Sequence, residues 1–387
     1  MENWSLNNHS MFDRNNIGVL KKWWLDIDKI NFSIILILII FGLMMTATSS
    51  PPIAKRIDVD KFFFLRKQLI FAFIALMILI SISFFDHEQI KLMAILGMIF
   101  SLILLILVLF IGSKAKGATR WISFAGLTLQ PSEFAKTFFI IFNALCLQKF
   151  YYTKIQFKYG ISLLSLLILM TLLFMQPDFG MMVSYLAIWA TQVFLYGLPL
   201  ILIGGLAFLA VFGGVGAYLS LPHVEDRINR FLDSGKKNYQ AERALDAFVN
   251  GSFFGKGPGN GMVKKHIPDV HTDFIFSAIA EEFGIISCAI ILLIFGYLVI
   301  RIVKRAIEEK DLFVYLSMCG LMMQFVMQVI VNTGVSLSIF PTKGMTLPFI
   351  SYGGSSLMAT AICFGLILAF TKRKYHREID YGNTKLL

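Results

Sequence analysis

Ten long apolar runs set the strongest constraint on this chain, because each is close to the roughly 20 residues that a helix needs to cross a bilayer. We predict membrane-spanning helices at 31–49, 62–84, 90–112, 131–149, 160–176, 179–196, 199–220, 273–301, 312–338 and 352–371. Gln176-Pro-Asp-Phe-Gly180 favours a loop between the fifth and sixth spans over a kink in one helix. The expected fold is an all-α polytopic membrane protein with about ten transmembrane helices.

The composition argues against a soluble protein. Hydrophobic residues make up 57% of the 387 residues and charged residues only 15%, whereas soluble domains contain about 25% charged residues. The formal net charge of +11 would suggest nucleic acid in a soluble protein, but basic residues also gather in the cytoplasmic loops of membrane proteins. We therefore expect no nucleic-acid partner. The four cysteines have no C-x-x-C spacing, so neither a disulfide framework nor a zinc site is predicted.

The distribution of basic residues predicts the orientation. The N-terminal tail, the 149–159 and 301–311 loops and the C-terminal tail are all basic, which favours both termini in the cytoplasm. The 50–61 loop disagrees, because Lys55, Arg56 and Lys61 would fall outside. We expect a cytoplasmic tail at 1–30, one transmembrane domain at 31–371 with a large outer loop at 222–272 between the seventh and eighth spans, and a cytoplasmic tail at 372–387.

Asp273 lies where the large outer loop enters the eighth span. A carboxylate at that depth is costly unless it faces a cavity or a partner. If the helix includes Asp273, Glu281 lies on nearly the same face and roughly 12 Å deeper, so we expect Asp273 at the mouth of a cavity with Glu281 below it. The alternative is a helix cap for Asp273 and an internal ion pair for Glu281.

A polar stripe runs along the ninth span, where Gln324, Gln328, Asn332 and Ser336 recur every four residues. Such a line must face protein or water rather than lipid. Hydrogen bonding between helices explains Gln324 and Gln328 better, whereas Asn332 and Ser336 lie nearer the outside and could line a cavity.

The large outer loop combines glycines, basic residues and a short amphipathic helix, predicted at Tyr239 to Asn250. Gly251-Ser-Phe-Phe-Gly-Lys-Gly257 is similar to a P-loop, but its spacing is one residue short and Lys256 is followed by Gly rather than Ser or Thr. The glycines alternate in the run Gly255-Lys-Gly-Pro-Gly-Asn-Gly261. The run is either a tight loop at the membrane surface or a source of backbone N–H groups for an anion. Basic residues also crowd the outer region, which suggests a negatively charged, membrane-embedded substrate such as a lipid pyrophosphate. They are Arg120, Arg227, Arg230, Arg243, Lys256, Lys264, Lys265 and Lys343.

Several motifs together resemble the SEDS family of cell-wall polymerases, whose branches are FtsW, RodA and SpoVE. The Pro-Thr-Lys-Gly form around Lys343 is more similar to the division branch than to the elongation branch. The motifs are Gly117-Ala-Thr-Arg-Trp121, Gln130-Pro-Ser-Glu-Phe-Ala-Lys136, Gln176-Pro-Asp-Phe-Gly180, Gly255 to Gly261, Pro268-Asp-Val-His-Thr-Asp-Phe-Ile-Phe276, Ala280-Glu-Glu-Phe-Gly284 and Pro341-Thr-Lys-Gly-Met-Thr-Leu-Pro-Phe-Ile-Ser-Tyr-Gly-Gly-Ser-Ser356.

The resemblance implies a peptidoglycan glycosyltransferase that polymerises lipid II, an undecaprenyl-pyrophosphate-linked disaccharide pentapeptide, during septal wall synthesis in the inner membrane. The essential aspartate of the family falls on Asp273, which we expect to act as the general base or, alternatively, to hold a divalent cation such as Mg²⁺ or Mn²⁺; no tightly bound cofactor is expected. The expected substrate-binding residues are Arg120, Glu133, Lys136, Arg243, Lys256, Glu281, Asn332, Lys343 and Ser351.

The resemblance also implies a class B penicillin-binding protein as partner, with further division proteins and membrane lipid around it. Two other functions stay open at the level of the sequence. One is a flippase that moves lipid II across the membrane, for which broken helices near Pro177 and Pro348 would be suitable. The other is a non-catalytic scaffold for the division machinery.

Overall fold

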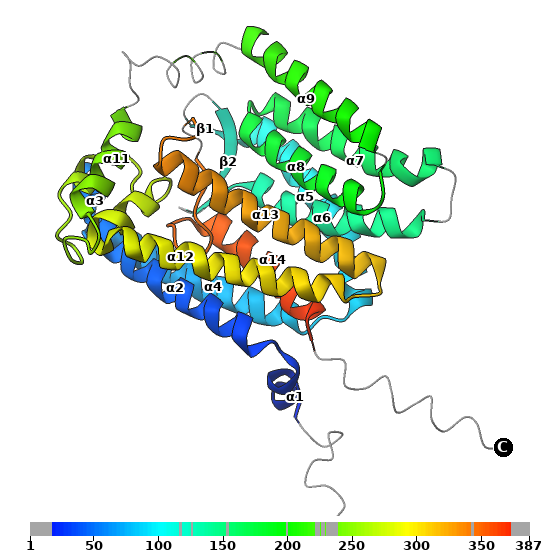
Figure 1. The fold of residues 1–387 in the computed structure, drawn as a ribbon, viewed down its shortest axis with the longest axis horizontal. Coiled ribbons are helices and arrows are strands. Elements are labelled where there is room, and N and C mark those ends of the chain that lie inside the picture. Colours follow the sequence, from blue (N-terminus) through cyan, green and yellow to red (C-terminus); the bar gives the residue numbers. More distant parts are fainter. Residues whose placement is uncertain are drawn as a thin grey trace, which may run out of the picture.

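A computed structural model shows a bundle of long helices whose axes run in roughly the same direction (Figure 1). The structure describes residues 18–115, 118–124, 127–151, 155–198, 200–220, 225, 229, 239–341 and 344–372. The helices are α1 Val19–Asp26, α2 Lys29–Ser49, α3 Pro51–Arg56, α4 Phe63–Ser83, α5 His87–Ile111, α6 Pro131–Lys149, α7 Ile155–Met175, α8 Phe179–Leu195, α9 Leu200–Ser220, α11 Tyr239–Gly251, α12 Ile275–Ile307, α13 Leu312–Ser336 and α14 Gly354–Phe370, with a 3-10 turn at Val263–His266.

Each predicted span coincides with one helix to within a few residues, and the short helix predicted from Tyr239 is α11. Within the residues that the structure describes, five helical segments are long and apolar enough to cross a membrane: Lys29–Arg56, Phe63–Ser83, His87–Ile111, Ile275–Ile307 and Leu312–Ser336. The polytopic helical fold is therefore confirmed, while the number of ten membrane crossings and the position of the large loop relative to the bilayer stay predictions.

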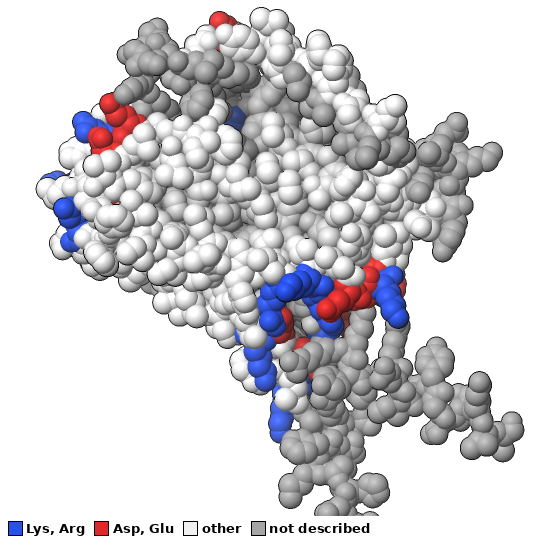
Figure 2. All heavy atoms as spheres, in the orientation of Figure 1, with Lys and Arg blue, Asp and Glu red and all other residues white. Residues whose placement is uncertain are grey.

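The surface has the pattern of a protein embedded in lipid. Apolar side chains such as Phe73 of α4, Phe110 of α5 and Leu293 of α12 are 67%, 80% and 72% exposed, which water would not favour. Figure 2 shows a broad uncharged middle on this face, with the Lys, Arg, Asp and Glu side chains at the two ends of the molecule. An uncharged belt between charged ends is the arrangement that a bilayer selects.

Local sequence signals explain where several helices begin. The side chain of Asp28 accepts hydrogen bonds from the backbone N–H groups of Ile30 and Asn31 at 3.1 and 3.2 Å, and Asp311 accepts from Phe313 at 2.9 Å. Asp178 caps α8 in the same way by accepting from Met181 at 3.3 Å. Such caps satisfy backbone donors that the first turn leaves without a helical partner.

Three short strands form a small antiparallel sheet that the all-α prediction did not include: β1 Ser113–Ala115, β2 Ala118–Phe124 and β3 Leu127–Leu129. Lys114 pairs with Thr119, and Ile122 pairs with Leu129. The strands are separated in sequence by Lys116-Gly117 and Ala125-Gly126, and two-residue connections ending in Gly are typical of hairpins. The sheet fixes the position of β2, which contains Arg120.

Helix packing joins segments that are far apart in the sequence. The strongest pairings join α14 to α4, α5 to α6, α11 to α12, and α13 to α6, α12 and α8. Helix α12 is broken at Gly284, where φ is 83° and ψ is 171°. The loops that precede α6, α12 and α14 consequently meet at one end of the bundle.

Candidate active site

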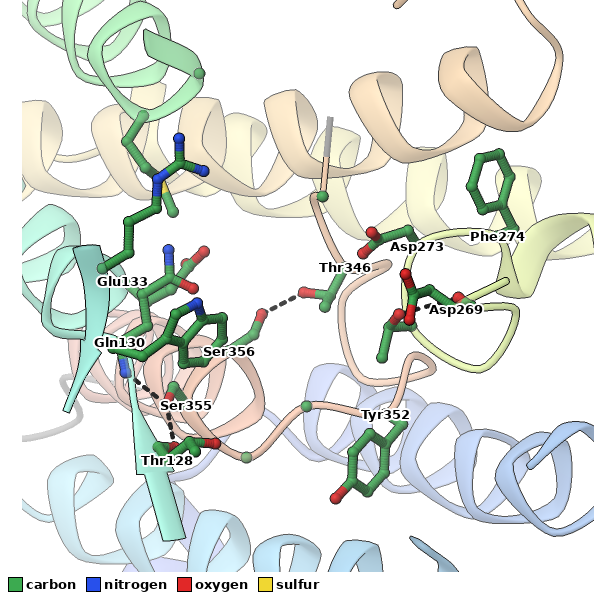
Figure 3. A pocket seen from close by; sticks show the side chains of 18 of the residues that line it. Thr128, Gln130, Glu133, Asp269, Asp273, Phe274, Thr346, Tyr352, Ser355 and Ser356 are labelled. Carbon is green, nitrogen blue, oxygen red and sulfur yellow. Dashed lines mark hydrogen bonds between the residues drawn. The ribbon is translucent and has the colours of Figure 1, made fainter. Parts of the chain in front are cut away.

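A cavity of about 550 Å³ lies where these loops meet. Figure 3 shows Asp269 and Asp273 on one side of it, Thr128, Gln130 and Glu133 on the other, and Thr346 and Ser356 between them. The lining residues come from α4, β2, β3, the start of α6, the 178–181 start of α8, α11, the 269–274 turn, the end of α13 and the 344–356 segment. They are Lys67, Phe71, Arg120, Trp121, Thr128, Gln130, Glu133, Asp178, Gly180, Met181, Gln240, Asp269, Thr272, Asp273, Phe274, Val335, Gly344, Thr346, Tyr352, Gly353, Gly354, Ser355 and Ser356.

Asp273 lies on a tight turn rather than on a helix. The carbonyl of Asp269 accepts hydrogen bonds from the backbone N–H groups of Thr272 and Asp273 at 3.1 and 3.0 Å, and Asp269 has a φ of 53°. Helix α12 begins only at Ile275, with Phe274 as its cap residue. The turn therefore presents both carboxylates to the cavity.

The expected alignment of Asp273 above Glu281 is wrong, because it assumed that one helix contains both residues. Helix α12 starts two residues after Asp273, so the helical spacing does not apply across the turn. Glu281 is fully buried and does not line the cavity. Its carboxylate accepts hydrogen bonds from the Asn250 side chain at 2.7 Å and from three consecutive backbone N–H groups, those of Met262, Val263 and Lys264, each at 2.8 Å.

The glycine-rich segment packs against the first turns of α12. Gly255, Gly257 and Gly259 have φ values of 81°, 92° and 78°, a region that glycine enters without steric cost. The backbone N–H groups of Lys256 and Gly257 donate to the carbonyls of Glu281 and Glu282 at 2.9 Å each. The backbone N–H groups that follow the glycine-rich segment, at 262–264, do bind an anion. That anion is the protein's own Glu281 carboxylate.

Two buried side chains join the Asp273 turn to the 344–352 segment. Asn332 of α13 donates from Nδ2 to the carbonyls of Asp273 and Met345 at 3.0 and 2.6 Å. Ser351 donates to the carbonyl of Thr272 at 2.6 Å and accepts from the Leu347 N–H at 2.8 Å. Neither residue lines the cavity. Both lie behind it, where they fix the backbone that presents Asp273.

Gly344 lies directly against Asp273, at the start of the 344–352 segment. A Cβ at position 344 would lie 3.1 Å from Oδ2 of Asp273, so a larger residue would crowd the carboxylate. The neighbouring Lys343, predicted to bind substrate opposite Asp273, lies outside the described residues, as do Arg227 and Arg230. The structure thus places the segment from Gly344 onward.

The opposite wall contains Arg120 in an ion pair. Its Nε lies 3.5 Å from Oδ2 of Asp178, and a second guanidinium nitrogen donates to the carbonyl of Pro177. Deeper in the same wall, the buried Lys136 donates to Glu133 at 3.0 Å, and Gln328 of α13 donates to the same oxygen of Glu133 at 3.4 Å. Glu133 lines the cavity, whereas Lys136 lies behind it.

The described lining contains more carboxylates than cations. Four acidic residues, Glu133, Asp178, Asp269 and Asp273, face two basic ones, Lys67 and Arg120. Arg243 and Lys256 are exposed and do not line the cavity; Arg243 pairs with Asp246 at 3.2 Å. Of the basic residues expected around the substrate, only Arg120 is seen to line the cavity in the part of the chain that the structure describes. Binding of substrate by Arg243, Lys256, Glu281 and the other predicted residues stays a prediction.

The acidic residues of the lining are the candidates for holding a divalent cation. Within the described ranges, no group of three His, Cys, Asp or Glu side chains is close enough together to hold a metal ion. The acidic side chains are divided between two walls, and two of them already engage Lys136 and Arg120. In the part of the chain that the structure describes, these residues do not form a site for a divalent cation.

Several lining residues were not predicted as site residues. Lys67 lies near the start of α4, just after the basic 50–61 loop that disagreed with the orientation rule. Its presence in the cavity lining gives one reason for a basic residue on that side. Asp178 could have been found from the Gln-Pro-Asp-Phe-Gly motif, which places a carboxylate beside an expected break between spans. Thr128, Thr346, Ser355 and Ser356 are ordinary hydroxyl residues, and no sequence signal separates them from other loop residues.

His271 predicts a pH dependence of stability. It is 4% exposed, its ring lies 4.6 Å from Phe64 and 5.1 Å from Tyr352, and burial lowers its pKa to about 4 from a usual value of about 6.5. Between these pH values the unfolded chain binds a proton that the folded chain excludes. Stability should therefore fall as the pH drops from about 6.5 to about 4, by about 3 kcal/mol in total.

The measurement is the melting temperature of the purified protein in detergent between about pH 7.5 and about pH 4.5, a range that covers most of the expected loss of stability. His271→Phe should flatten the curve. His266→Gln, at an exposed histidine of the same loop, should leave the curve unchanged. An unchanged slope in His271→Phe would show that other groups cause the pH dependence.

Asn332 provides a second prediction, on positioning. Asn332→Leu keeps the approximate volume but removes both hydrogen bonds that join Asp273 to Met345. Because misplacing a reacting group by about 1 Å can cost about a hundredfold in rate, we expect turnover to fall about 10- to 100-fold. Turnover is measured in parallel for Gln324→Leu, at a side chain two helical turns away on the same stripe of α13 that is bonded to Thr137. This control should lose less turnover than Asn332→Leu. Equal losses of turnover in the two variants would contradict a positioning role for Asn332.

A helical membrane protein with a polar cavity at one end of its bundle is the class that this geometry defines. A model of the cell cycle protein family of FtsW, RodA and SpoVE matches residues 29–376. The chain belongs to this family.

Similar proteins extend over nearly the whole chain. A Caulobacter vibrioides protein named "Probable peptidoglycan glycosyltransferase FtsW" is 35% identical over 94% of each chain, and a Trichlorobacter lovleyi protein of the same name is 35% identical over 85% of this chain and 88% of its own. A chain in the structure titled "Structural coordination of polymerization and crosslinking by a peptidoglycan synthase complex" has a TM-score of 0.77 at 28% identity, covering 90% of this chain and 98% of its own. Thermus thermophilus RodA, a rod shape determining protein, has a TM-score of 0.68 at 27% identity, covering 90% and 97%.

Proposed function

We propose that this chain is a peptidoglycan glycosyltransferase that polymerises lipid II into glycan strands during septal wall synthesis. The observation that carries the proposal is the cavity, in which a rigid turn presents Asp273 beside Gly344 while Arg120 lies in the opposite wall. The names of the relatives and their coverage of the whole chain support the same activity.

The reaction requires one proton transfer and one departing anion. The 4-hydroxyl oxygen of the acceptor sugar attacks C1 of the donor sugar, and the C1–O bond to the lipid pyrophosphate breaks. Asp273 accepts the hydroxyl proton, a role for which a positioned carboxylate is suitable. The lipid pyrophosphate leaves with the electron pair of the broken bond, and cations near the cavity stabilise its charge.

Arg120 and Lys343 are the proposed cations for the pyrophosphate, with Lys67 as a further candidate from the cavity lining. Arg120 is paired with Asp178, so it would have to share its guanidinium between that carboxylate and the substrate. An arginine has five N–H donors in a planar fork, which allows two acceptors to be bound together. Asp178 then orients Arg120 rather than neutralising its function.

We place the cavity on the outer side of the cytoplasmic membrane and both termini in the cytoplasm, at the division septum. The basic tails and loops support this orientation. A class B penicillin-binding protein is the proposed partner. The similar chain in a structure of a peptidoglycan synthase complex, whose title names polymerization and crosslinking, supports a partner of this kind.

The experiment uses the purified full chain together with its partner transpeptidase and labelled lipid II. Glycan strands that lengthen with time, and that a lysozyme-type glycosidase digests, are the expected product. In a parallel arm, the protein is reconstituted in vesicles with lipid II on one side only. Movement of lipid II across the membrane without strand formation would show a transporter instead of a polymerase. If neither strands nor movement were observed, the result would indicate a scaffold.

A further inference from the structure

A second cavity lies at the opposite end of the bundle from the candidate active site. It has a volume of about 540 Å³ and forms between the start of α2 and the end of α12. Four of its lining residues are basic, namely Lys29, Arg301, Lys304 and Arg305, and two are acidic, namely Asp28 and Glu308. Figure 2 shows charged side chains gathered at this end of the molecule, beyond the uncharged middle.

The charges are not balanced within the cavity. Arg301 is committed to Asp28 through contacts of 3.0 to 3.3 Å. Arg305 and Glu308 form an exposed pair at 3.3 Å, and exposed pairs of this kind contribute little and exchange easily. No ion pair involves Lys29 or Lys304 among the residues that the structure describes. Lys29, Lys304 and Arg305 are therefore available to a phosphate.

An apolar groove continues from this cavity along the same two helices. Its lining is Ile34 and Ile37 of α2 with Ile290, Leu293, Ile294 and Tyr297 of α12, and its volume is about 270 Å³. Tyr297 of the groove and Arg301 of the basic cavity are four residues apart on α12, which is one helical turn, or roughly 6 Å along the helix axis. The basic cavity and the groove thus form one continuous amphipathic site; α2 and α12 lie side by side in Figure 1.

The neighbouring helix α1 marks the level of a membrane interface. Trp24 is 47% exposed, and the Nζ of Lys29 lies 5.5 Å from its ring centroid. Trp23 donates from Nε1 to Ser83 at the end of α4 at 2.7 Å, which fixes α1 against the bundle. Tryptophan is enriched where lipid headgroups meet the acyl chains, so the basic cavity lies at headgroup depth.

From these observations we propose that this corner of α1, α2 and α12 binds an anionic phospholipid. The phosphate lies among Lys29, Lys304 and Arg305, and one acyl chain occupies the groove beside Tyr297. A partner's transmembrane helix could cover the apolar groove alone, but a lipid uses both the excess positive charge and the groove. Anionic headgroups gain about 1 kcal/mol for each nearby Lys or Arg, or about fivefold in affinity.

The test is native mass spectrometry of the full chain in a neutral detergent, titrated with phosphatidylglycerol, phosphatidylcholine or glycerol 3-phosphate. Phosphatidylglycerol should bind more tightly than either of the others. The double variant Lys304→Gln with Arg305→Gln should weaken phosphatidylglycerol about tenfold or more. The double variant Lys55→Gln with Lys61→Gln, which removes two positive charges near the other end of the bundle, should not.

Leu293→Trp tests the groove, because Leu293 is 72% exposed there and a larger ring would fill it. It should weaken phosphatidylglycerol while leaving glycerol 3-phosphate unchanged. Equal binding of phosphatidylglycerol and phosphatidylcholine, or full binding by the Lys304 and Arg305 variant, would overturn the proposal. So would a Leu293→Trp protein that keeps the lipid and loses its partner transpeptidase on purification, since the groove would then belong to that partner.

Discussion

Asp273→Asn should abolish most glycan polymerisation while leaving the protein folded. The substitution keeps the shape of the side chain, including its approach to Gly344, but removes the group that accepts the proton. General base catalysis contributes about 10²- to 10⁴-fold, so the rate with lipid II should fall by at least about a hundredfold. The melting temperature should change little, because Asp273 is not fully buried.

Asp269 provides the competing assignment, since it lines the same cavity four residues earlier. Asp269→Asn should cost less than Asp273→Asn, because Asp269 has its own backbone in a strained left-handed conformation and serves first to shape the turn. Asp246→Asn, on the exposed face of α11, should retain full activity. If Asp269→Asn were the more damaging of the two cavity variants, the base would be Asp269.

Glu281→Ala should have the largest effect on stability. The carboxylate is fully buried and satisfies four donors at 2.7 to 2.8 Å. Its removal leaves those donors without an acceptor, and each unsatisfied buried donor costs about 1–3 kcal/mol. We expect a loss of roughly 4 kcal/mol or more, which many membrane proteins would not survive on purification.

The measurement is the melting temperature together with protease cleavage in the 252–262 segment. Glu281→Gln keeps one carbonyl oxygen as an acceptor and should lie between wild type and Glu281→Ala. Glu308→Ala, exposed at the other end of the same helix, should change stability by less than about 0.5 kcal/mol. A stable but inactive Glu281→Ala protein would instead indicate that Glu281 binds substrate, as the sequence analysis expected.

The two predictions separate residues that the sequence could not. Asp273 and Glu281 both lie in motifs near the start of the eighth span. The spacing along a helix predicted that both side chains lie on one face. The structure divides them, because the chain turns at 269–274 before the helix begins. Asp273 faces the cavity and Glu281 faces the chain's own backbone, so we expect loss of activity from one and loss of folding from the other.

The helices were predictable because hydrophobicity over about 20 residues is a local property. Each predicted span has a helix in the structure. The small sheet around Arg120 was not predicted, since three strands of seven residues or fewer give a weak signal beside long apolar runs. The ion pair of Arg120 with Asp178 depends on two segments 58 residues apart in sequence meeting in space.

The polar stripe on α13 shows the same limit. Its period predicted correctly that these side chains are buried, because lipid would not accept them. The period could not say which partner each one has. Gln324 bonds to Thr137, Gln328 to Glu133, and Asn332 to the carbonyl of Asp273. Only the last contact reaches the turn that presents the proposed base.

Photocrosslinking of lipid II to the full chain tests the central claim most directly, because it locates the sugar independently of any rate. A lipid II analogue with a photoreactive group near its second sugar would be bound to the Asp273→Asn protein, irradiated and mapped by peptide mass spectrometry. The account predicts crosslinks in the segments that line the cavity, at 120–133, 269–274 and 344–356. Crosslinks spread between the two ends of the bundle, or confined to the exposed face of α11, would contradict it.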